Sequence, residues 1–182
     1  IGFWYEREAA RAGALTALLV TAMGGLAMLA GFILIGLATG SFALGEIVAD
    51  EARRSALASS PMFLPALLLV LAGAFTKSAQ FPFHFWLPHA MAAPTPVSAY
   101  LHSATMVKAG IFLLGRLFPA FAGTETWFYI VSGVGLTTQL FAAYVALFRH
   151  DLKGLLAYST VSHLGLITLL FGFGTPAGAV AA

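Results

Sequence analysis

Long apolar runs, separated by short polar stretches, dominate this sequence. They cover about residues 12–39, 61–80, 95–117, 126–148 and 154–173. A membrane-spanning helix needs about 20 mainly apolar residues, and no alternating strand pattern competes with the helices. The pattern therefore predicts an all-α membrane protein with about five transmembrane helices in a single transmembrane domain.

The composition of the first span and of the segments between spans gives further predictions. The first span is rich in small residues, which predicts close helix packing. Residues 41–60 carry mixed charges and are predicted to be an exposed connection or a short interfacial helix. The third span is predicted to end before Pro119. Because the sequence starts without a methionine and ends in an uncharged tail, we expect it to be an internal part of a larger helix bundle.

Composition supports the membrane assignment and excludes several other classes. Of the 182 residues, 60% are hydrophobic and 9% are charged, whereas soluble domains carry about 25% charged residues. The net charge of +2 is too small to indicate a nucleic-acid partner. The absence of cysteine excludes disulfides and thiol chemistry, and no soluble-enzyme motif occurs. We therefore assign no catalytic site, no metal and no cofactor, and leave open whether the chain belongs to an enzyme complex.

A helix interrupted by prolines follows the second span. Lys77 stands near the end of that span, and Pro82 and Pro88 follow within a stretch that stays apolar. Non-helical backbone at membrane depth is tolerated where protein buries it or where it lines a cavity, and transporters place ion sites there. We predict a helix break near Pro82, with Pro88 as a second breaking residue. Lys77 is then an intramembrane amine, the alternative being a lysine that reaches the interface.

Lys108 is the strongest single indication of function. It follows Thr95 by thirteen residues and precedes Arg116 by eight. Reaching the nearer interface would need about 12 Å along the helix, which a lysine side chain covers poorly. A charge at membrane depth costs about 3 kcal/mol. We therefore expect Lys108 to face a hydrated interior or a polar partner.

Three further groups could extend a proton relay, each with a structural alternative. His102 precedes Lys108 by six residues and could reach it through water or simply hydrogen-bond a neighbouring helix. His163 lies among serines, where relay and helix–helix bonding explain it equally well. Lys153 stands at a helix start, where the dipole disfavours a cation, so the residues alone favour an interfacial position. The remaining histidines are predicted to be interfacial: His84, His89 and His150.

Five motifs together resemble a known family. They are residues 75–82 (FTKSAQFP), 86–91 (WLPHAM), 93–99 (APTPVSA), 102–110 (HSATMVKAG) and 151–162 (DLKGLLAYSTVS). The combination resembles the proton-translocating antiporter-like family. That family comprises the large A subunit of Mrp-type Na⁺/H⁺ antiporters and the antiporter-like subunits of proton-pumping NADH:quinone oxidoreductase. The first 31 residues also resemble the Mrp protein, so the resemblance covers nearly the whole chain.

The resemblance implies a proton path along the membrane midplane, built from lysines, histidines, a glutamate and water. By this likeness Lys77 is the lysine at the broken helix, and His102 and Lys108 are the next relay groups. Lys153 becomes the lysine toward the central axis, a role that its position alone does not suggest. The modulating glutamate is expected before Ile1, and a second broken helix after Ala182.

The implied function is proton translocation in a multisubunit Na⁺/H⁺ antiporter. The implied location is a cell membrane, the inner membrane of a bacterium, with a multi-pass chain. Its partners would be other subunits of the complex, lipid, H⁺ and Na⁺. The alternative within the family is a proton-pumping subunit of NADH:quinone oxidoreductase. Outside it stand a haem-binding electron carrier using His102 and His163, and a purely structural membrane protein.

Overall fold

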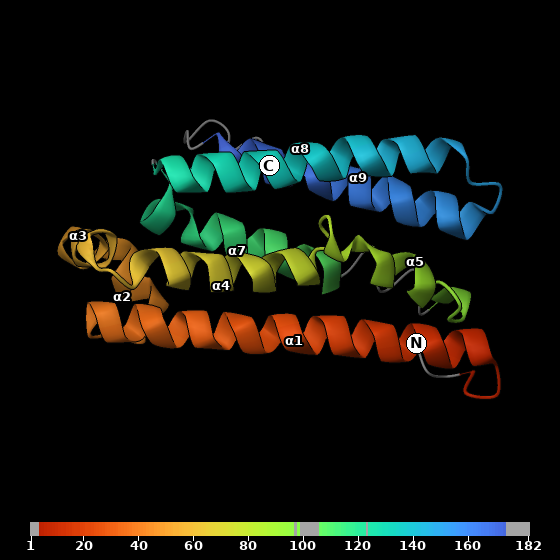
Figure 1. The fold of residues 1–182 in the computed structure, drawn as a ribbon, viewed down its shortest axis with the longest axis horizontal. Coiled ribbons are helices and arrows are strands. Elements are labelled where there is room, and N and C mark those ends of the chain that lie inside the picture. Colours follow the sequence, from red (N-terminus) through yellow and green to blue (C-terminus); the bar gives the residue numbers. More distant parts are fainter. Residues whose placement is uncertain (1–3, 97, 99–105, 123, 174–182) are drawn as a thin grey trace.

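The long helices of this protein run side by side along one axis (Figure 1). The computed structural model describes residues 4–96, 98, 106–122 and 124–173. Its elements are α1 (Glu8–Thr39), α2 (Leu44–Ala49), α3 (Glu51–Ser59), α4 (Phe63–Lys77), η1 (Phe83–Phe85), α5 (Trp86–Ala90), α7 (Met106–Phe121), α8 (Glu125–Leu147) and α9 (Leu152–Gly172). In Figure 1, α1 lies at one edge, α4 and α5 lie beside it, and α8 and α9 lie at the far edge. The elements within these described ranges are all helical, which confirms the all-α prediction.

Three of the described helices are long and apolar enough to cross a membrane, namely α1, α8 and α9. α4 qualifies only jointly with α3, and the two are bent by 103° at their junction. The predicted spans 61–80 and 95–117 correspond to α4, with 15 residues, and to α7, with 16. α4 is shorter than predicted because the helix breaks after Lys77, and residues 99–105 before α7 lie outside the described part. By length and apolarity the described chain thus offers three or four spans, where the sequence predicted about five.

The end of α7 corrects the prediction that this helix stops before Pro119. α7 continues through Pro119 to Phe121. A proline lacks the N–H that would bond to the carbonyl four residues earlier, here that of Gly115. The turn nevertheless continues, because the Ala122 N–H donates to the carbonyl oxygen of Phe118 at 2.8 Å. A proline in the last turn therefore removes one bond without ending the helix.

Glycines bring α1 and α4 into close contact. A Cβ on Gly24 would overlap the side chain of Thr76, and one on Gly31 would lie 2.6 Å from Cγ2 of Val70. Without a hydrophobic driving force between helices in lipid, such close approach is a main source of association. The small-residue pattern of the first span therefore has the packing role that the sequence indicated.

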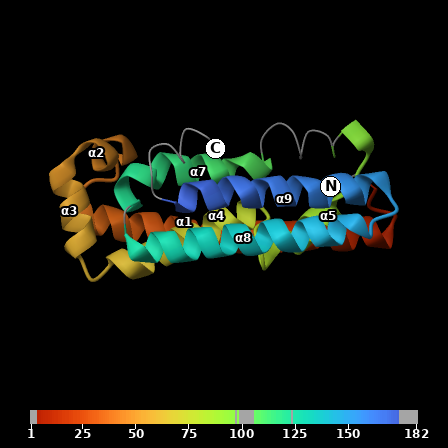
Figure 2. The ribbon, with the colours of Figure 1, turned by 90° about the horizontal axis from the view of Figure 1, so that it is seen from above.

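The broken segment as a whole follows α1. Gly13 near the start of α1 packs against the backbone of His89 in α5. α4 packs against the later part of α1, so the two pieces together accompany most of its 32 residues (Figures 1 and 2). Thr76 abuts Gly24, which lies near the middle of α1. The break that follows Thr76 therefore lies about halfway along the bundle.

α4 ends in a hydrogen-bonding pattern that would usually contain a glycine. Ala79 has φ 51°, in the left-handed region. This conformation lets the Gln80 N–H donate to the carbonyl oxygen of Phe75 at 2.9 Å, the six-to-one bond of a Schellman ending. An L-residue other than glycine in this region costs about 1 kcal/mol. The helix thus ends at Lys77, before the proline is reached.

Trp86 binds the next carbonyl of the broken helix. Its Nε1 donates to the carbonyl oxygen of Thr76 at 2.9 Å, and its side chain is fully buried. The Phe81–Pro82 peptide is cis, and η1 leads from it into α5. The predicted helix break near Pro82 is confirmed. Carbonyls freed at the break find partners within the protein, as the interior of a membrane requires.

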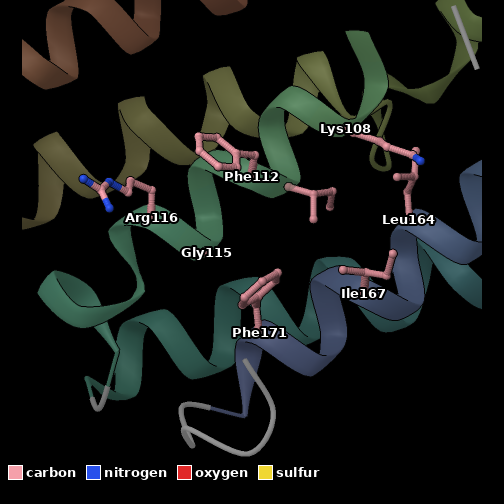
Figure 3. Close-up of a pocket in the computed structure, with 8 residues that line it drawn as sticks. Lys108, Phe112, Gly115, Arg116, Leu164, Ile167 and Phe171 are labelled. Atoms are coloured by element: carbon pink, nitrogen blue, oxygen red, sulfur yellow. The ribbon is translucent and has the colours of Figure 1, made fainter. Parts of the chain in front are cut away.

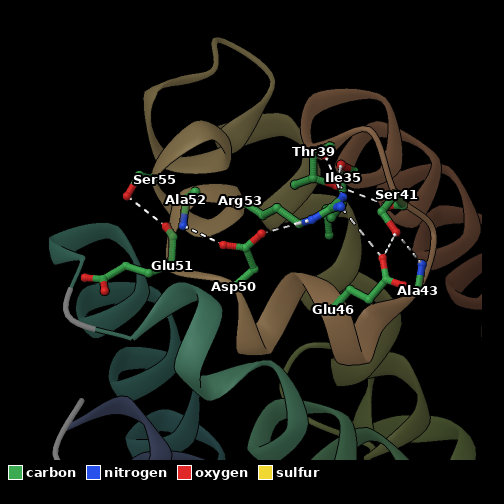
Figure 4. A network of polar contacts seen from close by, with 10 residues as sticks. All are labelled: Ile35, Thr39, Ser41, Ala43, Glu46, Asp50, Glu51, Ala52, Arg53 and Ser55. Carbon is green, nitrogen blue, oxygen red and sulfur yellow. Dashed lines mark hydrogen bonds and ion pairs between the residues drawn. The ribbon is translucent and has the colours of Figure 1, made fainter.

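A polar network fixes the corner between α1 and α3 (Figure 4). Arg53 donates from Nη1 to the carbonyl oxygen of Thr39 and from Nε to Asp50 Oδ2, each at 3.2 Å. Its Nη2 lies 3.9 Å from Glu46 Oε2. Asp50 also caps α3, because its carboxylate accepts from the N–H of Ala52 at 2.9 Å. The predicted charged connection thus folds as two short helices joined to the end of α1.

α8 and α9 form an antiparallel hairpin with closely spaced backbones. A Cβ on Gly135 would lie 2.9 Å from the carbonyl oxygen of Gly165. Thr124 and Asp151 cap the two helices, each side chain accepting an N–H of the first turn. The hairpin forms one wall of the bundle against which the broken segment and α7 pack.

Candidate functional site

Lys77 stands at the helix break, halfway along the bundle. It is the last residue of α4 and follows Thr76, which touches the middle of α1. The side chain is half-buried and lines a cavity of about 230 Å³ between α1, α4 and α7. The other lining residues are Met28, Phe32, Ala74, Ala109, Gly110, Phe112 and Leu113. The amine therefore lies at mid-depth in a cavity whose other side chains are apolar.

Lys108 faces a separate groove between α7 and α9 (Figure 3). The groove measures about 580 Å³, with Lys108 and Arg116 toward opposite ends. Its other lining residues are Ile111, Phe112, Gly115, Leu164, Ile167 and Phe171. In Figure 3 the Lys108 amine extends toward Leu164. The groove gives the amine room for water, and both ion pairs of the described residues belong to Arg53 instead.

Three titratable groups lie at a similar depth. Gly110 packs against the last turn of α4, so Lys108, two residues earlier on α7, is within about one turn of the break. Lys108 shares its groove with Leu164, the neighbour of His163. His163 is near the middle of the 21-residue α9. We refer to Lys77, Lys108 and His163 as the midplane belt.

Hydroxyl groups connect the break, α8 and α9 at this depth. The Phe81 N–H donates to Thr138 Oγ1 at 2.9 Å, which ties the break to α8. Ser162 Oγ donates to the carbonyl oxygen of Gln139 at 3.2 Å, which ties α9 to α8. Nδ1 of the exposed His163 lies 2.7 Å from the carbonyl oxygen one turn earlier in α9. The serine is thus a helix–helix contact, whereas the imidazole remains on an exposed face.

Lys153 lies apart from the midplane belt, in the first turn of α9. That end of α9 is opposite the end that carries α2 and α3 (Figure 1). Its Nζ donates to the carbonyl oxygen of Ala93 at 3.0 Å, and the side chain is half-buried. Its contact ties the first turn of α9 to the segment after α5, and both interpretations of this lysine stay predictions.

The structure places the other predicted residues as follows. His102 lies outside the described residues. Pro88 lies inside α5, in its first turn, where the missing N–H breaks no intrahelical bond, so no second break occurs there. His84 is half-buried, with its ring centroid 4.7 Å from that of Phe141, whereas His89 and His150 are exposed. Within the described ranges, no three histidine or acidic side chains gather to hold a metal ion.

Buried polar residues around the break were missed from the sequence. Ser78, Gln80 and Thr138 are at most 1% exposed, although each lies in an apolar stretch. Ser78 directly follows Lys77 and Gln80 lies two residues further on, so polar residues interrupting an apolar run were the available signal. Together with the half-buried Lys77 they give the region of the break polar groups that can hold charge and hydrogen-bond water.

Comparison with known proteins identifies the architecture. The family model described as "NADH:quinone oxidoreductase/Mrp antiporter, TM" matches residues 1–182. A Rhizobium meliloti protein, named as a probable K⁺/H⁺ antiporter A/B subunit, is 62% identical over 182 residues, which are 100% of this chain and 18% of that protein. The A subunit of an Na⁺/H⁺ antiporter from Alkalihalophilus pseudofirmus is 55% identical over 177 residues, 97% of this chain and 22% of that protein.

A solved structure agrees with these relatives. A chain in the structure of the Mrp complex from Dietzia sp. DQ12-45-1b superposes with a TM-score of 0.89 at 45% identity. The match covers 96% of this chain and 19% of that chain. The chain thus spans about a fifth of the length of the relatives it matches. The resemblance seen in the motifs is confirmed: this multi-pass membrane chain belongs to the NADH:quinone oxidoreductase/Mrp antiporter transmembrane family.

Proposed function

We propose that this chain forms one proton-conducting half of a subunit in a multisubunit Na⁺/H⁺ antiporter. Protons would move along an intramembrane relay of Lys77, His102, Lys108, His163 and Lys153, with water between them. Other subunits of the same complex would complete the path. Two relatives bear the names of K⁺/H⁺ and Na⁺/H⁺ antiporter subunits, which supports cation–proton exchange as the class of reaction.

The observation that carries the proposal is the position of Lys77. Lys77 ends a helix halfway along the bundle and lies in a cavity with apolar walls. Placing a charged amine at that depth in a membrane costs free energy, which supports a functional role for the residue. A lysine there can hold a proton as an ammonium and release it as the cavity or a neighbouring charge changes. The helix break supports this, because discontinuous helices are where transporters place ion sites.

The midplane belt suggests how the proton would continue. Lys77 and Lys108 lie at similar depth but line different cavities. Phe112 lines both cavities, so α7 separates the two amines at this residue. Water in the Lys108 groove would extend the path toward α9, where His163 lies beside Leu164. Lys153 would act at the far end of α9, beside Ala93.

Lys77→Ala and Lys108→Ala in the complete complex test the proposal. Everted membrane vesicles carrying the complex would receive a pH gradient, and its dissipation by added Na⁺ or K⁺ would be followed with a pH-sensitive dye. Both variants should assemble and lose cation-dependent proton flux. Arg11→Ala removes an exposed positive charge at the start of α1 and serves as the control.

The competing functions predict different outcomes. Normal flux in the lysine variants would refute the relay. A purely structural role predicts that the lysine changes reduce assembly in proportion to flux. A proton-pumping subunit of NADH:quinone oxidoreductase predicts proton movement that depends on NADH and quinone instead of an added cation. A haem-binding carrier predicts a Soret absorbance in the purified complex.

A further inference from the structure

Three polar groups at the helix break have no hydrogen-bond partner among the described residues. Ser78 Oγ and Gln80 Oε1 are buried and unpaired within the part of the chain that the structure describes. The residues themselves are 1% and 0% exposed. The Lys77 amine likewise bonds to no other described side chain. Buried polar atoms in native proteins are nearly always paired, with protein or with ordered water.

Four described donors around the break, other than the Ser78 hydroxyl and the Lys77 amine, are already used. The Gln80 N–H bonds to Phe75, and the Trp86 indole bonds to Thr76. The hydroxyl of Thr138 donates to the carbonyl oxygen of Val134 at 2.6 Å while it accepts from the N–H of Phe81. The Gln80 carboxamide oxygen therefore needs a donor that these groups do not supply.

One of the two unpaired atoms, Ser78 Oγ, adjoins the Lys77 cavity. A Cβ on Gly110 would overlap both Ser78 Oγ and the carbonyl oxygen of Ala74, and Gly110 and Ala74 line that cavity together with Lys77. The Gln80 carboxamide folds back onto the same residue, its Nε2 donating to the carbonyl oxygen of Ser78 at 3.3 Å. Ser78 thus connects the carboxamide to the wall of the cavity that holds the amine.

We propose that Ser78 and Gln80 bind water beside Lys77, and that Gln80 positions the water that exchanges a proton with this lysine. This inference rests on the proposed function. The proton leaves the Lys77 ammonium for the water, the amine keeps the electron pair, and the resulting hydronium passes the proton onward. Gln80 gains and loses no proton, because its carboxamide only donates and accepts hydrogen bonds. It is a positioning residue whose oxygen accepts one water hydrogen and so turns a lone pair toward the ammonium.

The free-energy cost of burying the Gln80 carboxamide favours a functional role for this residue over accidental burial. Burying an unpaired amide costs about 1–3 kcal/mol by mutational measures, and leucine would fill similar space without that cost. A bound water removes the cost while the glutamine is kept, since a site with several polar partners and enough room holds water stably.

Gln80→Leu in the complete complex tests the inference, with Gln139→Leu on α8 as the matched control. Gln139 is half-buried, and its side chain makes no hydrogen bond with the described residues. Gln80→Leu should assemble normally, yet slow cation-driven proton flux by about ten-fold, the effect of losing one hydrogen bond beside a charge. Gln139→Leu should match wild type. Gln80→Glu keeps acceptor oxygens and should restore flux in part, with the optimum moved to higher pH because a carboxylate favours the ammonium.

A structure of the complex that resolves ordered water gives a readout independent of transport. We expect a water within hydrogen-bond distance of Gln80 Oε1, and its loss in Gln80→Leu. A direct protein donor on that oxygen would overturn the inference, and so would wild-type flux in Gln80→Leu. If Gln80→Leu fails to assemble, the proton flux of Ser78→Ala and the presence of the ordered water in the wild-type complex test the inference instead. A wild-type complex without cation-coupled proton flux would refute the proposed antiport function. It would leave the bound water untested by flux, and the structure of the complex would then test that water directly.

Discussion

Lys153 donates its amine to the carbonyl oxygen of Ala93 at 3.0 Å, across 60 residues of sequence. The contact ties the first turn of α9 to the segment that follows the broken helix. An ammonium at this helix start is disfavoured by the dipole, and the carbonyl compensates for that placement.

Lys153→Met should therefore loosen the segment after α5. The variant keeps the length of the side chain but removes the charge-assisted bond, worth about 1.5 kcal/mol. We expect faster amide hydrogen exchange around residue 93 together with lower proton flux. Lys153→Arg, which can still donate to the carbonyl, should retain the protection. Unchanged exchange in Lys153→Met would show that the contact does not hold the segment.

Gly24 and Gly25 are neighbours in α1 with opposite surroundings. A Cβ on Gly24 would overlap Thr76, whereas one on Gly25 would meet nothing within 4 Å. Gly24→Ala should separate α1 from α4 and sharply reduce the amount of assembled complex. Gly25→Ala should be neutral or stabilising, because alanine gains up to about 1 kcal/mol over glycine in a helix. Fluorescence size-exclusion of the detergent-solubilised complex would measure both, and equal losses would contradict the contact between Gly24 and Thr76.

Arg53 at the α1–α3 corner should contribute less to the stability of the complex than its number of polar contacts suggests. Its partners Glu46 and Asp50 are well exposed, and pairs of this kind contribute about 0–1 kcal/mol. Arg53→Ala should lower the Tm of the complex slightly, and the difference from wild type should shrink at high salt. A large loss that salt does not change would assign the effect to the bond with Thr39 instead of the ion pairs.

The helices were predictable because apolar runs of membrane length leave few alternatives. The predicted span 126–148 and the observed α8, Glu125–Leu147, differ by one residue at each end. The break was located at Pro82, but the helix ends five residues earlier. Ala79 adopts the left-handed conformation there, and an alanine carries no sequence signal for such an ending.

The candidate site was predictable as residue types but not as an arrangement. Lys77 and Lys108 were identified because a charge inside an apolar run is costly. Their similar depth depends on Gly110 packing against the end of α4, which is a tertiary contact. The bond of Lys153 to Ala93 is equally invisible in the sequence, and so is the burial of Gln80. Periodicity describes one helix at a time, whereas these features depend on which helices meet.

Trp86 and Trp127 offer a matched test of what the break contributes to function. Both side chains are fully buried, and both donate from Nε1 to a main-chain carbonyl oxygen, that of Thr76 at 2.9 Å and that of Phe171 at 3.0 Å. Replacing either by phenylalanine keeps an aromatic ring and leaves one buried carbonyl unpaired, which costs about 1–3 kcal/mol. The two variants should therefore lower the Tm of the complex by similar amounts.

Their effects on transport should differ. Thr76 directly precedes Lys77, so Trp86→Phe removes a bond that holds the end of α4 and the attached amine in place. Trp127 bonds to Phe171 near the end of α9, which lines the Lys108 groove about two turns beyond Leu164 and is attached to no titratable group of the belt. We expect Trp86→Phe to slow cation-driven proton flux and change its pH profile at temperatures where the complex remains folded, and Trp127→Phe to leave both unchanged. Equal transport defects would mean that flux follows overall stability, and the break would then have no special role in placing Lys77.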